Sequence, residues 1–375
     1  MANDLTTPLT GRKRKAGAPR PKLPIARILF AVLAVIATAF ILRLVLTDDP
    51  NGGRPSEEVA IATSRNGNEI ANRVSTEPVT ITADPQQFAA GGSIAAVPNG
   101  TSGAGSISGL PDIFGALPDL SEETNDGPIP RISATGQTPF SAYSRPVDTT
   151  AMAGMAKVAI VVTGLGINEQ GSLDALDQLP DEATLAFAPY GKSLTTTVAA
   201  ARSAGHEILL EVPLEPFDFP QNDPGPQTLL TGEPLRANLE KLFWLMARFG
   251  GYVGVINNMG ARFTASAADF SPIMEELGAR GLGYLDDGSS NRSLANQLAV
   301  GNKVPFSRAE LTIDANPSRQ SILAALASLE AKALEKGEAI GIVSALPISV
   351  TAVAEWSRGL ESKGIALVPA SALMK

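Results

Sequence analysis

The pattern of apolar positions in this chain changes near residue 157. Beyond that point, short runs of aliphatic residues recur, bounded by glycine, proline or polar residues. Runs of this length indicate strands that are buried on both faces, as in a parallel sheet. The predicted strands are 158–162, 184–187, 207–212, 252–256, 281–285, 339–343 and 365–368, with a weaker one at 311–313.

Longer stretches with the character of helices separate these runs. The predicted helices are 193–204, 235–249, 266–280, 317–336 and 349–363. Two of them end near Gly281 and Gly337, as helices with a C-terminal glycine do. Strands that alternate with helices in this way favour a closed or nearly closed (β/α) barrel. An open, doubly wound sheet remains the alternative, because periodicity alone does not separate the two.

The first predicted strand runs directly into Thr163-Gly-Leu-Gly166. Glycines allow a sharp turn where a strand passes into a helix. Ligands of parallel α/β folds bind at the carboxyl ends of strands, so this loop is expected at the rim of any site. An ordinary turn without chemistry is the alternative interpretation.

The N-terminal part of the chain has the features of a membrane anchor. Residues 1–27 are basic, 28–46 are almost wholly apolar, and Asp48 and Asp49 follow. This order predicts a basic cytoplasmic tail and one transmembrane helix. The predicted location is the inner (cytoplasmic) membrane, with the C-terminal domain periplasmic or otherwise extracytoplasmic. A cleaved signal peptide is the alternative, but no small-x-small cleavage site follows the apolar run.

Residues 47–129 are rich in glycine, serine, proline, asparagine and threonine. Such a composition buries too little apolar surface to offset chain entropy, so we predict a disordered linker. The apolar stretch 110–120 is interpreted as a patch within that linker. The globular domain is expected to span residues 130–375.

Composition excludes several classes of site. The chain of 375 residues has no cysteine and a single histidine, so it forms neither disulfides nor a zinc site of several histidines. Its net charge is -8 and its one basic cluster lies before residue 28, which argues against nucleic-acid binding. A metal held by carboxylates and amides alone would be Mg²⁺ or Ca²⁺, a weak Lewis acid for amide hydrolysis.

Five long motifs together resemble the divergent polysaccharide deacetylases, which are related to the NodB-type carbohydrate esterases. The motifs are IVVTGLG at 160–166, TLAFAPY at 184–190, GHEILLEVPLEP at 205–216, NNMGARFT at 257–264 and YLDDGS at 284–289. The resemblance implies a distorted barrel of the glycoside hydrolase/deacetylase type and export to the cell envelope. It also implies metal-assisted hydrolysis of N-acetyl groups on a glycan.

The chain departs from the family where the chemistry is expected. The family's Asp-Asp-Leu-Gly supplies a base and a metal ligand, and Thr163 and Gly164 stand there. Asn258 replaces the histidine of Asn-His-Met-Gly, and Val343-Ser-Ala345 corresponds to a late Gly-His-Pro motif. The ligands of the family's divalent metal are thus missing, and we expect neither a metal nor another cofactor.

The remaining catalytic candidates are Glu215, Asp286, Asp314 and His206. The three carboxylates follow predicted strands, so they could converge at one rim and carry out acid/base work. His206 precedes a buried strand, and a hydrogen-bonded structural role is favoured for it over a catalytic one.

The substrate-binding candidates are Tyr190, Phe217, Asn258, Arg262 and Asp287. Sugars stack on aromatic faces, and long loops at a barrel rim often wall a cleft. Loop capping is the alternative for the carboxylates, because Asp286-Asp-Gly288 is by itself a good turn sequence.

Three functions follow from these observations. The favoured one is an envelope protein that binds cell-wall glycan without hydrolysing it. The second is an active N-deacetylase with a rearranged carboxylate site, and the third is a non-enzymatic scaffold for a cell-wall enzyme.

Overall fold

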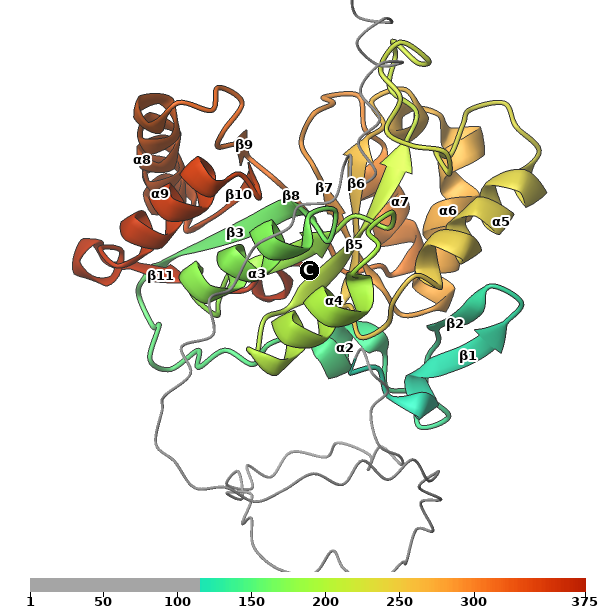
Figure 1. Ribbon diagram of the computed structural model, residues 1–375, viewed down its shortest axis with the longest axis horizontal. Helices are drawn as coiled ribbons and strands as arrows, with labels where there is room; N and C mark the ends of the chain where they lie inside the picture. The colour runs from blue at the N-terminus through green and yellow to red at the C-terminus, as the bar shows by residue number, and fades with distance from the viewer. Residues whose placement is uncertain (1–114) are drawn as a thin grey trace, which may run out of the picture. The chain divides into compact units, whose positions relative to one another are not determined.

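The computed structural model describes residues 115–375, in which parallel strands form a nine-stranded sheet surrounded by helices (Figure 1). The strands of the sheet are β3 Ala156–Leu165, β4 Thr184–Phe187, β5 Ile208–Leu214, β6 Gly254–Met259, β7 Gly283–Asp286, β8 Phe306–Arg308, β9 Leu311–Thr312, β10 Glu338–Ser344 and β11 Ile365–Leu367. All eight predicted strands are present, and β8 is the member of this sheet that the sequence pattern missed.

The order of the strands distinguishes a barrel from a doubly wound sheet. The hydrogen-bonded path is β8-β7-β6-β5-β4-β3-β10-β9, with β11 beside β3. The two ends of this path, β8 and β9, are parts of one short segment. Its Ala309 N–H donates to Asp286 O of β7, and its Glu310 N–H donates to Ile340 O of β10. The sheet therefore curls into a half-barrel, and this segment spans its open side. The predicted barrel architecture is thus confirmed as a curled half-barrel of parallel strands, and the doubly wound sheet is excluded.

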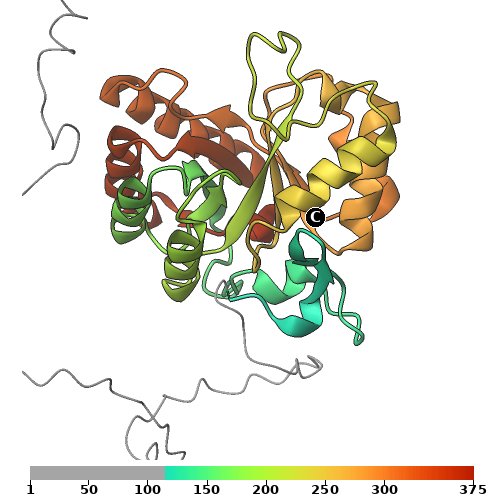
Figure 2. The same ribbon diagram turned by 45° about the vertical axis from the view of Figure 1, so that its right-hand side comes forward.

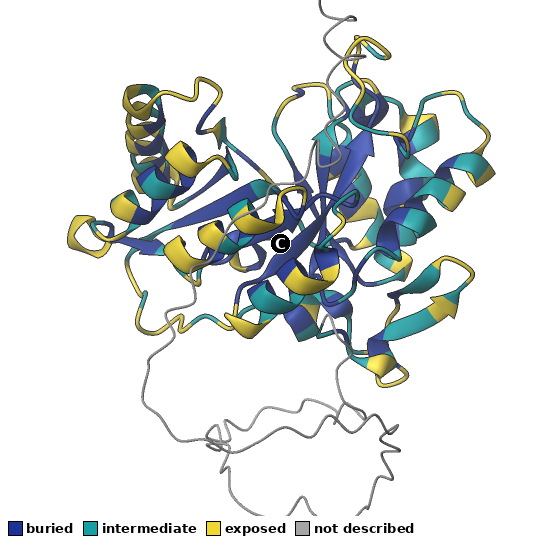
Figure 3. Ribbon diagram, in the orientation of Figure 1, coloured by how far each residue is buried: buried dark blue, intermediate teal, exposed yellow. Residues whose placement is uncertain are grey.

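Alternation along the strands divides the core into two parts. On β3, Ala159 and Val161 face the interior of the barrel, and their cluster includes side chains such as Leu209 and Ile256 from other strands. Val158, Ile160 and Val162 face outward, in the cluster that contains the apolar sides of the surrounding helices. Figure 3 shows the buried strands inside, with the exposed sides of the helices outermost. Burial on both faces explains why the strands are near-continuous apolar runs.

The helices lie around this sheet, as the turned view in Figure 2 also shows. Their bounds are α3 Glu169–Gln178, α4 Leu194–Ser203, α5 Leu235–Met246, α6 Ala267–Ala279, α7 Ala295–Asn302, α8 Arg319–Lys336 and α9 Pro347–Ser357, with 3-10 turns η2 Phe263–Ala265, η3 Glu361–Lys363 and η4 Ala370–Leu373. All five predicted helices are present, and α8 ends at Gly337 with φ 88°. Helices α3 and α7 were missed.

The amino ends of the strands are covered by a segment that begins within the predicted linker and ends within the predicted domain. This segment contains η1 Pro118–Leu120, the antiparallel pair β1 Ser121–Thr124 and β2 Gly127–Pro130, and α2 Pro139–Tyr143. Leu120 and Ile129 are each 1% exposed, and the Leu117 N–H donates to Tyr143 Oη. The packed part of the chain thus begins before the predicted boundary at 130, because these few apolar side chains have a barrel end to cover.

The predicted tail at 1–27, the transmembrane anchor at 28–46 and the linker up to 114 lie outside the described residues. Within 115–375, no helix combines the length and the apolar character needed to cross a membrane.

Candidate functional site

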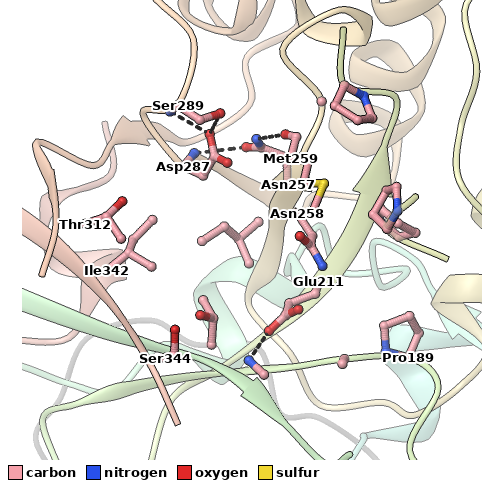
Figure 4. Close-up of a pocket in the computed structure, with 18 of the residues that line it drawn as sticks. Pro189, Glu211, Asn257, Asn258, Met259, Asp287, Ser289, Thr312, Ile342 and Ser344 are labelled. Atoms are coloured by element: carbon pink, nitrogen blue, oxygen red, sulfur yellow. Dashed lines mark hydrogen bonds between the residues drawn. The ribbon is translucent and has the colours of Figure 1, made fainter. Parts of the chain in front are cut away.

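A cavity of about 500 Å³ lies at the carboxyl ends of the strands (Figure 4). Its lining comes from the ends of β3, β5, β6, β9 and β10 and from the loops that follow β4, β5 and β7. Apolar walls predominate, with prolines from three segments, and polar groups are interspersed among them. No Lys, Arg or His of the described chain lines this cavity.

The alternation that builds the barrel interior also selects the side chains that reach the cavity. On β5, Leu209 faces the interior, so Glu211 and Pro213 do as well, and both line the cavity. The same reasoning brings in Thr163 from β3 and Ser344 from β10. Each strand thus contributes its interior-facing positions nearest the carboxyl end.

The four positions at which this chain lacks the chemical groups of the family pattern all lie at this cavity. Thr163 and Ser344 are register partners on the neighbouring strands β3 and β10. Asn258 pairs in register with Pro213. Gly164 has φ 81°, in the left-handed region that favours glycine. All four residues line the cavity, where they offer hydroxyl, amide and backbone groups but no imidazole or carboxylate.

Glu211 is the most unusual residue of the cavity. It is 5% exposed, and its Oε1 accepts a hydrogen bond of 2.5 Å from the Gly164 N–H. No other hydrogen bond within the described chain reaches this carboxyl, so its Oε2 is left to the cavity. Burial raises the pKa of Glu211 to about 7 from an ordinary value of 4.5, because desolvation disfavours the charged form and one N–H offsets this only in part.

Asp287 is the second carboxyl group of the cavity. Its Oδ1 accepts hydrogen bonds from the N–H and the hydroxyl of Ser289, at 2.9 and 2.6 Å. Burial raises the pKa of Asp287 as well. Its position is fixed by Asn257, whose Oδ1 accepts hydrogen bonds from the Asp287 N–H and from Tyr284 Oη.

The turn after β6 sets the direction of Asn258. The next residue, Met259, has φ 62°, which is rare for a residue with a side chain. The Asn257 side chain holds this turn by donating to Met259 O at 2.7 Å. In Figure 4 the Asn258 side chain extends toward Glu211, whose carboxyl is directed at its own hydrogen-bond donor. Strained backbone of this kind concentrates at functional sites.

Tyr190 and the loop after β5 form one wall of the cavity. The Tyr190 ring packs at 6.4 Å from that of Trp244, and its Oη accepts a hydrogen bond from the Gln227 N–H. Asn222 and Pro224 of the same loop complete this wall. Of the five predicted binding residues, Tyr190, Asn258 and Asp287 therefore line the cavity.

The three acidic catalytic candidates lie elsewhere, and each is held by internal bonds. Glu215 accepts from the N–H and hydroxyl of Thr231 and forms an ion pair with Arg262 at 3.0 Å. Asp286 accepts from the Gly288 N–H and the Ser293 hydroxyl. Asp314 accepts from the Ser344 N–H and the Ser349 hydroxyl. None of the three lines the cavity, and each carboxylate accepts hydrogen bonds from neighbouring loop or strand-end groups.

The other candidates are also outside the cavity lining. His206 lies at the amino end of β5, 1% exposed, with its Nδ1 3.0 Å from Ala183 O. Burial lowers the pKa of this imidazole. Phe217 is 56% exposed on the loop after β5, and Arg262 is committed to its ion pair with Glu215.

The donor set does not fit the divalent metal that the family resemblance implies. Structural and catalytic zinc sites use at least three His, Cys or carboxylate ligands. Across residues 115–375, no three such side chains come close enough to hold a metal ion. The cavity itself has only Glu211 and Asp287 of these types.

Glu211 is one of the cavity residues that the sequence analysis did not single out. The sequence does carry a signal for this residue, because Glu211 is a carboxylate within an otherwise apolar strand. Alternate residues of a strand face the same side of the sheet, so Glu211 is expected on the interior face together with Leu209. The same alternation separates Asp287, which faces the cavity, from its neighbour Asp286.

Comparison with known proteins gives matches over the whole barrel. Residues 160–374 match the family described as divergent polysaccharide deacetylase. The crystal structure of an uncharacterised protein, Atu2773 from Agrobacterium tumefaciens C58, is 43% identical, with a TM-score of 0.64, over 66% of this chain and 100% of that one. The uncharacterised protein YibQ of Escherichia coli (strain K12) is 24% identical over 219 residues, 58% of this chain and 67% of YibQ.

A more distant likeness is to the catalytic domain of peptidoglycan N-acetylglucosamine deacetylase from Eubacterium rectale ATCC 33656. It is 16% identical over 61% of this chain and 93% of that one, with a TM-score of 0.39.

Proposed function

The chain belongs to the divergent polysaccharide deacetylase family, and on that basis we propose that it binds cell-wall glycan in the cavity without the metal-dependent hydrolysis that the family resemblance implies. The observation that carries this proposal is the composition of the cavity. Thr163, Gly164, Asn258 and Ser344 stand together on its lining, where the family pattern has acids and imidazoles.

The walls of the cavity support the glycan as ligand. Tyr190 and several prolines offer flat apolar faces, on which the C–H faces of sugars pack. Hydroxyl and amide groups such as those of Ser289 and Asn258 supply hydrogen bonds for sugar hydroxyls. A largely apolar cavity with a few convergent polar groups is typical of ligand sites.

The setting proposed for this activity is the cell envelope. The order of basic, apolar and acidic residues in 1–49 supports it. In this arrangement the apolar stretch 28–46 anchors the chain in the inner membrane and the barrel works outside the cytoplasm. The alternative non-enzymatic role is that of a scaffold that binds a cell-wall enzyme.

The direct test combines metal analysis, product analysis and binding with the purified full-length protein. We expect no stoichiometric Zn²⁺, no acetate released from acetylated chitooligosaccharides or peptidoglycan, and sedimentation of the protein with isolated peptidoglycan. Acetate release that a chelator abolishes would refute the proposal. Absence of sedimentation, together with co-purification of a wall enzyme, would favour the scaffold instead.

Restoring the missing groups tests whether the cavity retains the family geometry. The double variant Thr163→Asp, Asn258→His is expected to take up more Zn²⁺ than the wild type, because it adds a carboxylate and an imidazole to one cavity. Gly164 is left unchanged in this variant, since its φ of 81° would strain a side chain. The matched control is Asp314→Asn, which alters a carboxylate outside the cavity lining. Unchanged uptake by the double variant would mean that the two positions do not share a metal site.

A metal-free hydrolase is the second candidate, and Glu211 is the observation that favours it. General acid/base catalysis is most efficient when the pKa lies near the working pH, and burial raises the pKa of Glu211 to about 7. This candidate predicts chelator-resistant acetate release that Glu211→Gln abolishes.

A further inference from the structure

Glu211 is a buried acid without a cationic partner. Its single hydrogen bond comes from the Gly164 N–H, while its second oxygen has no partner among the described residues and adjoins the cavity. Burying a carboxylate is costly unless a charge or several hydrogen bonds compensate it. Natural cores rarely keep such a group without a use, so its position within an apolar strand calls for a compensating partner from outside the chain.

Two cations of the loops around the cavity, Arg262 and Arg308, are committed to other groups. Arg262 pairs with Glu215 at 3.0 Å. Arg308 donates to the carbonyl oxygens of Gly288 and Ser290 and lies 4.0 Å from Asp286. The cavity thus holds two carboxyl groups, Glu211 and Asp287, and no positive charge from the described chain.

From this arrangement we propose that the cavity takes the primary ammonium group of a deacetylated amino sugar, with the Glu211 carboxylate as its counter-ion. The inference rests on the proposed glycan-binding function and names the chemical form of the glycan that the site prefers.

The surroundings of Glu211 suit an ammonium group carried by a sugar. An ammonium has three donors and no acceptor, so it needs a carboxylate and further oxygen acceptors around it. Asn258 shares the cavity lining with Glu211, and an amide oxygen can accept one of these bonds. Thr163 and Ser344 lie on the same lining and offer hydroxyl oxygens. The apolar walls would then hold the sugar ring.

An acetylated sugar would not compensate Glu211 in the same way. An acetamide N–H can donate one bond to the carboxyl group but brings no charge into the cavity. Hydrogen bonds between charged groups are about twice as strong as those between neutral groups. The cavity should therefore discriminate in favour of the free amine, the reverse of what a deacetylase needs from its substrate.

The test is calorimetric titration of the full-length protein at neutral pH with two tetrasaccharides, one of glucosamine and one of N-acetylglucosamine. Glu211→Gln keeps the shape of the side chain and removes its charge. Asp218→Asn is the matched control, because it removes the same charge from an exposed residue on the loop after β5 that is outside the cavity lining. The diamine cadaverine is the control for an ammonium group without a sugar.

We expect the glucosamine tetramer to bind the wild type more tightly than the acetylated tetramer. Glu211→Gln should lower the affinity for the glucosamine tetramer by about 10- to 100-fold, as loss of a hydrogen bond between charged groups does. The same variant should weaken binding of the acetylated tetramer much less, because the Gln amide oxygen can still accept a bond from an acetamide N–H. Asp218→Asn should change neither affinity. A thermal melt of Glu211→Gln verifies that the variant is folded.

The outcomes separate this inference from the function on which it rests. Tighter binding of the acetylated tetramer, or equal loss in Asp218→Asn, overturns the ammonium site and leaves glycan binding intact. Cadaverine binding as tight as that of the glucosamine tetramer overturns the sugar assignment. Absence of binding by either tetramer removes both the inference and the proposed function.

Discussion

At the scale of single residues, the Glu211 carboxylate that is proposed to bind the ligand also lowers the stability of the fold when it ionises. Its folded-state pKa of about 7 lies above its ordinary value of 4.5. The folded protein therefore binds more protons than the unfolded chain between these two values, and its stability falls as the pH rises through this range. The charged carboxyl destabilises the fold fully above about pH 7 and not at all below about pH 4.5.

Glu211→Gln should consequently be more stable than the wild type in alkaline solution. The difference in the free energy of unfolding should reach up to about 3 kcal/mol above the folded pKa and vanish in acid. Urea unfolding of both proteins on either side of this window measures it, with Asp218→Asn as the control. A variant less stable than the wild type at every pH would show that the ionised carboxyl is already compensated within the protein.

A second residue-scale prediction concerns the turn that sets the position of Asn258. Gly260 has φ 94°, and a Cβ there would lie 2.4 Å from Leu214 Cβ. Gly260→Ala should lower the free energy of unfolding by about 2–4 kcal/mol, from left-handed strain and overpacking together. Gly232→Ala is the matched control, since Gly232 has φ 76° but no atom within 4 Å. It should cost only the strain, about 1–2 kcal/mol. Equal losses in the two variants would contradict the close packing at Gly260.

At the scale of elements, the segment from η1 to α2 is expected to be part of the folding unit. Removing residues 1–130 deletes Leu120 and Ile129, both 1% exposed, and uncovers the amino ends of the strands. Each large buried side chain contributes about 2–5 kcal/mol, so this truncation should lower the unfolding midpoint strongly or prevent folding.

The matched truncation removes only residues 1–114 and retains both side chains. We expect it to unfold cooperatively with the midpoint of the full chain, measured by circular dichroism and by resistance to protease. If both truncations behaved alike, the segment 118–130 would contribute nothing to the core.

At the scale of the whole molecule, the entry point of the chain and the cavity lie at opposite ends of the strands. Ala116 is 4% exposed, and the adjacent Leu117 N–H donates to Tyr143 Oη, at the end where η1 and α2 cover the barrel. The cavity is at the carboxyl ends. The described chain thus begins at the end of the barrel away from the cavity.

The predicted topology has its own test. A reporter fused after Asp49 should be active only in its export-dependent form, because the basic residues before position 28 retain the N-terminus in the cytoplasm. Fusion of the same reporter after Arg27 is the control and should be active only in its export-independent form. Export-independent activity after Asp49 would overturn the anchor, the location and the envelope glycan together.

The α/β class and most elements of the barrel could be predicted because they depend on local periodicity. Strands buried on both faces require continuous apolar runs, and the eight that the pattern indicated are all present. Strand β8, of three residues, and the pair β1 and β2 carry too little periodic signal. They form because β7 and the barrel end supply partners that are distant in the sequence.

The site divides in the same way. The sequence by itself determined which chemical groups are available: one histidine, no cysteine, and Thr163, Asn258 and Ser344 in place of acids and imidazoles. Only the tertiary structure decided that these positions share one cavity, that Glu215, Asp286 and Asp314 lie outside its lining, and that Glu211 faces the interior. The physical reason is that side-chain direction follows strand register and parity, and both are set by hydrogen bonds between segments far apart in the chain.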